Sequence, residues 1–176
     1  LLHLGKIDRK TDNNLLKYTF NNSNGGHSDW IRSLASLENG YLASSSDDAS
    51  IKIWDISNGK LKYTLDKPND ECQFSNARLL ASLENGYLAS GSFGVNDGTI
   101  KIWDVTSGKL KYVFDQSNEG HSDYIGALLS FDNEYLASGS DDSTIKICNI
   151  NTGKLKFTFD QSKGGHQNAV KFLASF

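Results

Sequence analysis

The sequence lacks methionine and has one proline and two cysteines among its 176 residues. Two cysteines are too few for a disulfide framework, which favours a reducing, intracellular and cytoplasmic environment. No apolar run approaches the roughly 18 residues that a membrane-spanning helix requires. A net charge of −3 argues against a nucleic acid or an anionic membrane as partner. The lack of any methionine, the initiator included, leads us to expect an excerpt of a longer protein.

A short sequence motif recurs along the chain. Ile-Lys-Ile-Trp-Asp stands at 51–55 and again at 100–104, and Ile-Lys-Ile-Cys-Asn stands at 145–149. Self-similarity with a period of about 45–50 residues indicates one supersecondary unit copied along a single repeat region. The predicted boundaries within residues 1–176 are 1–20 for the end of a partial repeat, 21–65, 66–114 and 115–159 for three full repeats, and 160–176 for the start of another partial repeat.

Each copy holds four short apolar runs that are separated by turn residues. In the first full copy the runs are about 30–36, 41–46, 50–55 and 60–65. The joints contain Asn-Gly or Asp-Asp pairs, which favour the tight turns that link antiparallel strands. The runs are β-branched or aromatic and alternate as strands do. The sequence therefore predicts an all-β fold made of four-stranded antiparallel meanders.

These residues resemble the WD-repeat (WD40) β-propeller family. The family's signature is Gly-His near the start and Trp-Asp near the end of each repeat, here Gly26-His27 and Trp54-Asp55 in the first full copy. The resemblance implies a ring of four-stranded blades around a central channel. The chain holds about four blades' worth of meanders, so we expect an incomplete ring whose other blades come from the full-length chain or a second copy. Closure of the chain on itself is the alternative.

The resemblance also implies a structural hydrogen-bond network in each copy. Its members are a histidine, a serine or threonine, an aspartate and the tryptophan. Carried over by position they are His27, Ser46, Asp48 and Trp54, then Ser92, Asp97 and Trp103, then His121, Ser140 and Asp142. Cys72 or Gln73 stands at the histidine position of the second copy, and Cys148 replaces the tryptophan of the third. We expect a weaker network in the third copy, because the indole donor is lost.

The serine, histidine and aspartate of each copy also fit the composition of a hydrolase triad. A catalytic site need not be copied in every repeat, whereas a network that holds a blade must be, so we favour the structural interpretation. His27, His121 and His166 recur at one repeat position and offer no paired metal-ligand spacing. The glycine-rich stretch 91–98 lacks the Gly-Lys-Ser/Thr of a phosphate loop. We predict no enzyme activity, no cofactor and no metal.

The resemblance implies that partners bind at the loops after the histidine and before the aspartate of each copy. The residues at these positions are Ser28, Trp30, Asp47, Phe74, Asn76, Asn96, Ser122, Tyr124 and Asp141. Trp30 and Tyr124 are candidate anchors, since large aromatic side chains carry much of the energy of an interface. Asp47 and Asp141 favour a peptide that bears Lys or Arg, unless they merely solvate tight turns.

The predicted function is a non-catalytic scaffold that binds a protein or peptide through this loop face. The alternative is a sensor or targeting arm of a larger enzyme or signalling protein, whose other domains lie outside this chain. The second copy is the irregular one, with the only proline in its first loop and an elongated turn over 93–98. Because loops vary without disturbing a blade, we expect individual function in these two loops.

Overall fold

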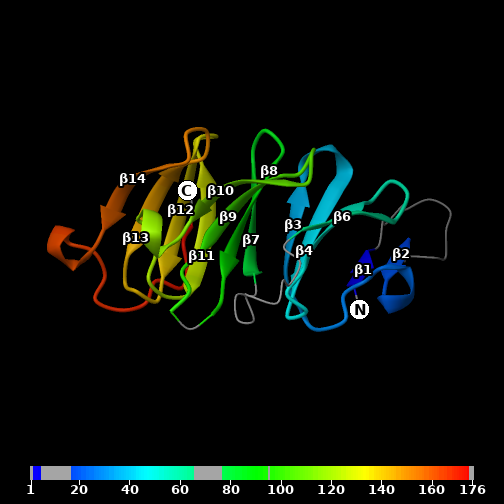
Figure 1. Cartoon of the computed structure of the whole chain (residues 1–176), viewed down its shortest axis with the longest axis horizontal. Coiled ribbons are helices and arrows are strands. Elements are labelled where there is room, and N and C mark those ends of the chain that lie inside the picture. Colours follow the sequence, from blue (N-terminus) through cyan, green and yellow to red (C-terminus); the bar gives the residue numbers. More distant parts are fainter. Residues whose placement is uncertain (1, 5–16, 66–76, 95, 175–176) are drawn as a thin grey trace.

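A computed structural model describes residues 2–4, 17–65, 77–94 and 96–174 of the chain. Three four-stranded antiparallel sheets, here called blades 1, 2 and 3, account for most of this part (Figure 1). Blade 1 consists of β3 (Ile31–Leu37), β4 (Tyr41–Ser46), β5 (Ile51–Asp55) and β6 (Lys60–Leu65). Blade 2 consists of β7 (Ala77–Leu83), β8 (Tyr87–Ser92), β9 (Ile100–Asp104) and β10 (Lys109–Phe114). Blade 3 consists of β11 (Ile125–Phe131), β12 (Tyr135–Ser140), β13 (Ile145–Asn149) and β14 (Lys154–Phe159).

The remaining elements are short. A two-stranded sheet pairs β1 (Leu2–Leu4) with β2 (Tyr18–Phe20). The four short 3-10 helices are η1 (Asn22–Asn24), η2 (Glu38–Gly40), η3 (Gln116–Asn118) and η4 (Gln161–Lys163). Within every blade the strands pair in chain order, because joints of three to seven residues connect antiparallel neighbours. The all-β meanders that the sequence predicts are confirmed.

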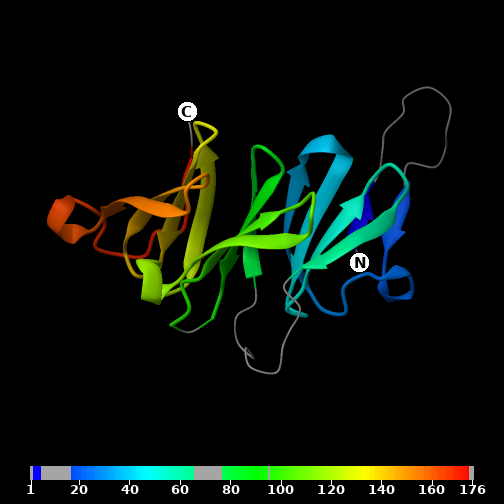
Figure 2. The same cartoon turned by 45° about the horizontal axis from the view of Figure 1, so that its top comes forward.

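The blades stand side by side in chain order. β7 packs against both β3 and β11, so the first strand of each blade is the innermost one. The two-stranded sheet adjoins blade 1 at one end of the row, near the N-terminus, and blade 3 lies at the other end (Figure 2). The described sheets thus form an open row and not a closed ring.

The core lies between neighbouring blades. Ile51, Ile53 and Leu65 of blade 1 pack with Leu88 and Trp103 of blade 2 in one buried cluster. A corresponding cluster joins blade 2 to blade 3, and Phe20 of β2 packs on the blade 1 tryptophan, with ring centroids 4.2 Å apart. Because side chains alternate along a strand, each sheet presents one apolar face to the blade before it and another to the blade after it.

A tyrosine on β2, β6 and β10 reaches into the next blade. The hydroxyls of Tyr18, Tyr63 and Tyr112 donate to the backbone oxygens of Ser57, Thr106 and Asn151, each over 2.8 Å. Each ring lies against a turn glycine of positive φ, and a Cβ on Gly59 would stand 2.3 Å from the Tyr18 ring. The turn therefore needs glycine both for its backbone conformation and for this close approach.

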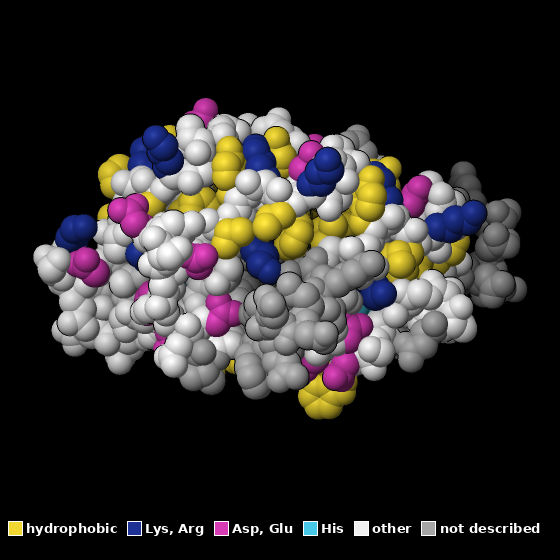
Figure 3. All heavy atoms as spheres, viewed as in Figure 1, with side chains coloured by type: hydrophobic (Ala, Val, Ile, Leu, Met, Phe, Trp, Pro, Cys, Tyr) yellow, Lys and Arg dark blue, Asp and Glu magenta, His cyan; other side chains and the backbone are white. Residues whose placement is uncertain are grey.

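Lysines of the outermost strands lie over tyrosine rings at matching positions. The distance from Nζ to the ring centroid is 3.7 Å for Lys62 over Tyr41 and 3.6 Å for Lys111 over Tyr87. Figure 3 shows Lys and Arg side chains beside hydrophobic ones across the upper part of the displayed face. The placement of these lysines supports a role in protecting the sheet edge, because a charged outermost strand resists pairing with another sheet.

Candidate functional site

The predicted network forms a continuous chain of hydrogen bonds in blade 1. The indole Nε1 of Trp54 donates to Ser44 Oγ over 2.8 Å, and Ser44 Oγ lies 2.7 Å from His27 Nε2. The other imidazole nitrogen, Nδ1, lies 3.0 Å from Asp48 Oδ2. A neutral imidazole protonated at Nδ1 satisfies all three contacts, with the serine hydroxyl donating to Nε2.

The charges of this network follow from burial and hydrogen bonding. Burial lowers the pKa of His27 and outweighs the opposite influence of Asp48. Burial acts to raise the pKa of Asp48, but hydrogen bonds from the Ser50 hydroxyl and the Ser28 amide, together with His27, hold it below its usual range. A neutral histidine beside a charged carboxylate is therefore the state near neutral pH.

Blade 3 repeats the network without its tryptophan. His121 Nδ1 lies 2.9 Å from Asp142 Oδ2, and its Nε2 lies 2.8 Å from Ser138 Oγ. Cys148 occupies the tryptophan position, and burial raises the pKa of its thiol to about 12. Burial also acts to raise the pKa of Asp142, but hydrogen bonds from His121 and Thr144 outweigh it and leave the pKa below its usual range.

The serine of the network differs from the predicted one in every blade. Ser44, Ser90 and Ser138 make the contacts that the sequence assigned to Ser46, Ser92 and Ser140. Residues two apart lie on the same face of a strand, so both serines of each pair are eligible. Trp54 stands opposite Leu42 in the register, which makes Ser44 the nearer serine.

The displaced serines stabilise turns instead. Ser46 Oγ accepts from the Asp48 amide, and Ser140 Oγ accepts from the Asp142 amide. In blade 2, Ser92 Oγ donates to the Asp97 carbonyl, and Trp103 Nε1 donates to Ser90 Oγ. The two candidates for the missing histidine, residues 72 and 73, lie outside the described residues.

The hydrolase interpretation finds no support in the geometry of the serine. Ser44 is fully buried, and its Oγ already contacts the indole and the imidazole. A nucleophile must be able to reach a substrate carbonyl, which this hydroxyl does not. Among the described residues, no group of three or more His, Cys, Asp or Glu side chains could hold a metal ion. No helix of that part of the chain is long and apolar enough to cross a membrane.

A different set of side chains meets at the start of the innermost strands. The pairing of β3 with β4 shifts between Ile31 and Ser33, and the pairing of β7 with β8 shifts between Ala77 and Leu79. The residues inside these bulges are Arg32 and Arg78, and the residue in the matching bulge of β11 is Gly126. A bulge turns a side chain away from the regular alternation of the strand.

The segment after blade 3 adds a third cation. The Val170 amide donates to the Ser140 carbonyl over 2.8 Å, which holds this segment against the end of β12. Lys171 follows at the position that Arg32 and Arg78 hold in their own copies. One repeat position thus supplies three cationic side chains to the same rim.

Carboxylates from the loops after β4 and β12 pair with these cations. Arg32 donates to Asp47 Oδ2, and Arg78 Nε lies 3.5 Å from Asp47 Oδ1. Lys171 Nζ donates to Asp141 Oδ2 over 2.6 Å. The hydrogen bond from Arg32 holds the pKa of Asp47 below its usual range. Both predicted partner-binding aspartates are therefore engaged by cations of this chain.

Aromatic rings form the floor beside these ion pairs. The rings of Phe93 and Tyr124 stack with centroids 4.4 Å apart and an interplanar angle of 13°. The Arg78 guanidinium lies 3.9 Å from the centroid of Phe93. Arg32 lies 4.9 Å from the ring of the exposed Trp30. Arginine on an aromatic face adds cation–π attraction and leaves the N–H groups at the edge of its planar guanidinium available to other acceptors.

These side chains line a pocket of about 360 Å³, which is within the range of sites that hold small ligands or single side chains. Arg78, Phe93 and Tyr124 contribute to its wall, as does Gly126, which stands where the other copies carry a cation. A Cβ on Gly126 would stand 2.5 Å from the Val170 carbonyl oxygen. Glycine is thus required at this position, because the backbone of residues 170–171 occupies the place of a side chain.

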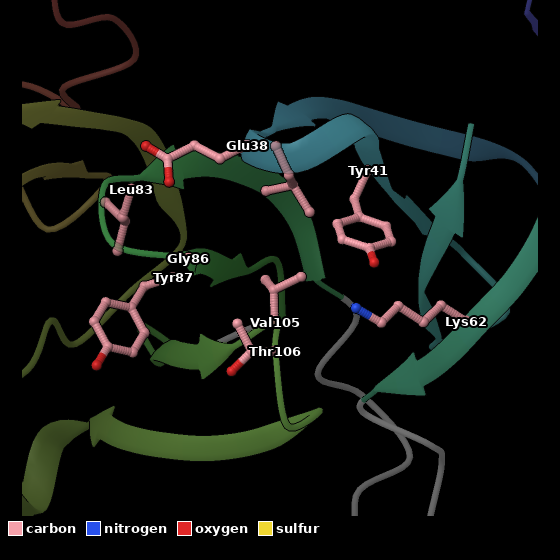
Figure 4. A pocket seen from close by; sticks show the side chains of 9 residues that line it. Glu38, Tyr41, Lys62, Leu83, Gly86, Tyr87, Val105 and Thr106 are labelled. Atoms are coloured by element: carbon pink, nitrogen blue, oxygen red, sulfur yellow. The ribbon is translucent and has the colours of Figure 1, made fainter. Parts of the chain in front are cut away.

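A second cavity, between blades 1 and 2, is too small for a ligand. Figure 4 shows Tyr41 and Lys62 of blade 1 facing Tyr87, Val105 and Thr106 of blade 2. The enclosed space measures about 20 Å³, which is room for a single water molecule. The larger pocket is therefore the candidate functional site.

The predicted partner residues fall into three groups. Trp30, Asp47, Tyr124 and Asp141 surround the pocket or contact the side chains that line it. Three others stand at turns, where the Ser28 and Ser122 amides donate to network aspartates and the Asn96 carbonyl accepts from Gln116. Phe74 and Asn76 lie outside the described residues.

The prediction missed Arg32, Arg78 and Lys171, and it named Phe93 only as part of a long turn. The signal for all four is the repeat alignment itself. The cations follow Ile31, Ala77 and Val170 at one repeat position, and Phe93 follows Ser92 as Asp47 follows Ser46. Comparing copies position by position would have shown both patterns.

Comparison with known proteins agrees with this architecture. Residues 16–55, 76–104 and 108–149 match the family described as WD domain, G-beta repeat. The chain is 40% identical over 42 residues to pre-mRNA-splicing factor PRP46 of Eremothecium gossypii, which is 23% of this chain and 10% of that protein. The similar segment thus spans a tenth of the curated relative, about the length of one repeat.

Two solved structures resemble a much larger part of the chain. The computationally designed Ika4 protein has a TM-score of 0.66 at 32% sequence identity, covering 82% of this chain and 79% of that one. The structure of U3-55K has a TM-score of 0.65 at 26% identity, covering 82% of this chain and 42% of that one.

Proposed function

Since the chain belongs to the WD40 repeat family, we propose that it is a non-catalytic scaffold that binds a protein or peptide at the pocket beside the three bulges. The observation that carries the proposal is the stacked pair of Phe93 and Tyr124 beneath Arg78. Aromatic and arginine side chains are the residues that most often dominate binding energy at protein interfaces. The residues that build the pocket vary between copies, since Phe93 stands in blade 2 where Asp47 and Asp141 stand in the other blades.

The structure removes the reason for expecting a positively charged partner. A Lys- or Arg-bearing peptide was expected because Asp47 and Asp141 stand on this face. Each of these carboxylates pairs with a cation of the chain itself, so neither offers its full charge to a partner. The proposed scaffold role does not depend on that charge, because the stacked rings offer apolar contact area of their own.

The proposed location also changes. The curated relative is a pre-mRNA-splicing factor by name, which favours a nuclear assembly over the cytoplasmic location expected from composition. The shared segment is only 42 residues long. A single repeat carries the fold of a blade, so the relative's role in splicing is not transferred to this chain.

A matched pair of variants tests the scaffold role. Phe93 and Phe131 are each 38% exposed, and each ring stacks on a tyrosine, but only Phe93 lines the pocket. Proteins captured from cell extract by the chain are compared among wild type, Phe93→Ala and Phe131→Ala. We expect Phe93→Ala alone to lose the captured partner while its melting temperature stays close to that of Phe131→Ala. Equal capture by both variants would rule out the pocket as the binding site.

A further inference from the structure

Among the described residues, the rim of the pocket carries more cations than carboxylates, and the imbalance arises in blade 2. The bulge position holds a cation in three copies: Arg32, Arg78 and Lys171. The position after the second strand holds a carboxylate in two copies: Asp47 and Asp141. Phe93 stands in blade 2 where the other two blades carry aspartate. Among the residues that the structure describes, blade 2 therefore supplies no carboxylate to Arg78 at this rim.

The contacts of Arg78 show the consequence. Its guanidinium stacks on Phe93 at 3.9 Å, and its Nε is 3.5 Å from Asp47 Oδ1. That carboxylate already accepts the hydrogen bond of Arg32. A distance of 3.5 Å is long for a charge-assisted hydrogen bond, which is typically about 2.7–2.9 Å. An incoming carboxylate could approach Arg78 more closely than Asp47 does.

The exposed charge at the rim is positive. The side chains of Arg78 and Lys171 are 33% and 50% exposed, whereas those of Asp47 and Asp141 are 17% and 21% exposed. A partner that approaches the pocket therefore meets cationic tips before it meets carboxylates. Complementary charge at such a rim raises the association rate and rejects partners of the wrong sign.

The floor of the pocket selects for an apolar group next to the acid. The stacked Phe93 and Tyr124 rings and the Leu79 side chain offer carbon surface. A free phosphate would leave this surface unused. A peptide with a carboxylate beside an aliphatic or aromatic side chain uses both parts of the site.

We infer that the pocket binds an acidic peptide segment, with a Glu or Asp side chain paired to Arg78 and a neighbouring apolar side chain on the Phe93–Tyr124 stack. The inference rests on the proposed scaffold function and specifies its partner. It replaces the expected Lys- or Arg-bearing peptide with one of opposite charge. The acid would complete the alternation of cation and carboxylate that blade 2 interrupts.

The first experiment screens a displayed library of random peptides on the whole chain, on Arg78→Gln and on Lys109→Gln. The control removes the same charge from blade 2 at the exposed start of β10, away from the pocket. We expect wild type and Lys109→Gln to enrich peptides in Asp and Glu beside apolar residues, and Arg78→Gln to lose that enrichment. Enriched peptides without acids would overturn the inference and leave the scaffold standing. Failure to enrich any peptide would overturn both.

The second experiment measures the affinity of the most enriched peptide by fluorescence anisotropy. Phe93→Asp places a carboxylate beside Arg78, as in the other blades, and Phe93→Asn makes the same change without charge. We expect Phe93→Asp to bind about tenfold more weakly than Phe93→Asn, because its carboxylate competes with the peptide for Arg78. Equal affinities of the two variants would contradict the inference. Tighter binding of a uridine octamer than of the peptide, lost in Arg78→Gln, would assign the pocket to RNA instead.

Discussion

Blades 1 and 3 hold the same histidine, aspartate and serine in nearly the same geometry, yet only blade 1 has the tryptophan. The imidazole contacts in the two blades agree closely: Nε2 lies 2.7 and 2.8 Å from the serine Oγ, and Nδ1 lies 3.0 and 2.9 Å from the carboxylate. The indole of Trp54 closes the chain in blade 1, and the Cys148 thiol takes its place in blade 3. The polar part of the network therefore keeps its geometry without the indole.

The same two blades differ in how their following face is covered. Leu65 of blade 1 is 3% exposed beneath blade 2, whereas Phe159 at the matching position of blade 3 is 43% exposed. The tyrosine that reaches into the next blade is Tyr63 in blade 1, and the residue at that position in blade 3 is Phe157. Blades 1 and 3 thus carry different residues at the two positions where blade 1 contacts blade 2.

The largest expected effect comes from making blade 1 resemble blade 3. Trp54→Cys removes a fully buried indole that packs on Phe20 and donates to Ser44. We expect the free energy of unfolding to fall by about 3 kcal/mol or more, the usual range for loss of a large buried aromatic side chain. Urea unfolding followed by circular dichroism measures it. Cys148→Ala, the matched control in blade 3, should lose about 1 kcal/mol, and equal losses would refute the comparison.

Removing the serine should sharpen the difference between the networks. Ser44→Ala leaves the Trp54 indole and the His27 Nε2 without their partner, whereas Ser138→Ala removes the partner of His121 Nε2 and a long 3.4 Å bond to the Lys146 carbonyl. Each buried polar group left unpaired costs about 1–3 kcal/mol. We expect Ser44→Ala to lose roughly twice the stability that Ser138→Ala loses in the same unfolding assay. A larger loss for Ser138→Ala would show that the indole bond contributes little.

The repeats made much of this fold predictable, because a copied pattern reports the same structure several times. The meanders, the histidine and aspartate of two networks and the two tryptophans all occupy their expected places. The serine was misassigned because Ser44 and Ser46 lie on the same strand face, and only the register shows which one faces Trp54. Sequence alternation carries no information about that register.

The candidate site was predictable in position but not in charge. Trp30, Asp47, Tyr124 and Asp141 do lie together at the rim, although their role in binding stays a prediction. The cations were missed because a bulge redirects a side chain that strand alternation would place elsewhere. Their pairing with aspartates of the same or the preceding copy is a tertiary contact that no local pattern reveals.

His27 and the carboxylates of the networks affect stability in different pH ranges. Its lowered pKa means that the unfolded chain binds a proton first, so stability falls as the pH drops below the usual histidine value of about 6.5. The lowered pKa values of Asp48 and Asp142 act in a second window, below about 4. We expect His27→Asn to flatten the stability profile between about pH 7 and 5. An unchanged slope in that range would show that protonation of His27 does not couple to folding.

The smallest expected effect concerns the hydroxyl that links neighbouring blades. Tyr63→Phe removes the donor to the Thr106 carbonyl and keeps the ring against Gly108, so only the hydrogen bond is lost. We expect a loss of about 1 kcal/mol in urea unfolding, the usual net value of such a bond. Phe157→Tyr adds a hydroxyl at the matching position of blade 3, where the side chain is exposed, and should change stability by less than about 0.5 kcal/mol. A gain as large as the Tyr63→Phe loss would mean that Phe157 already lies against an acceptor, and the contrast between the covered face and the open one would fail.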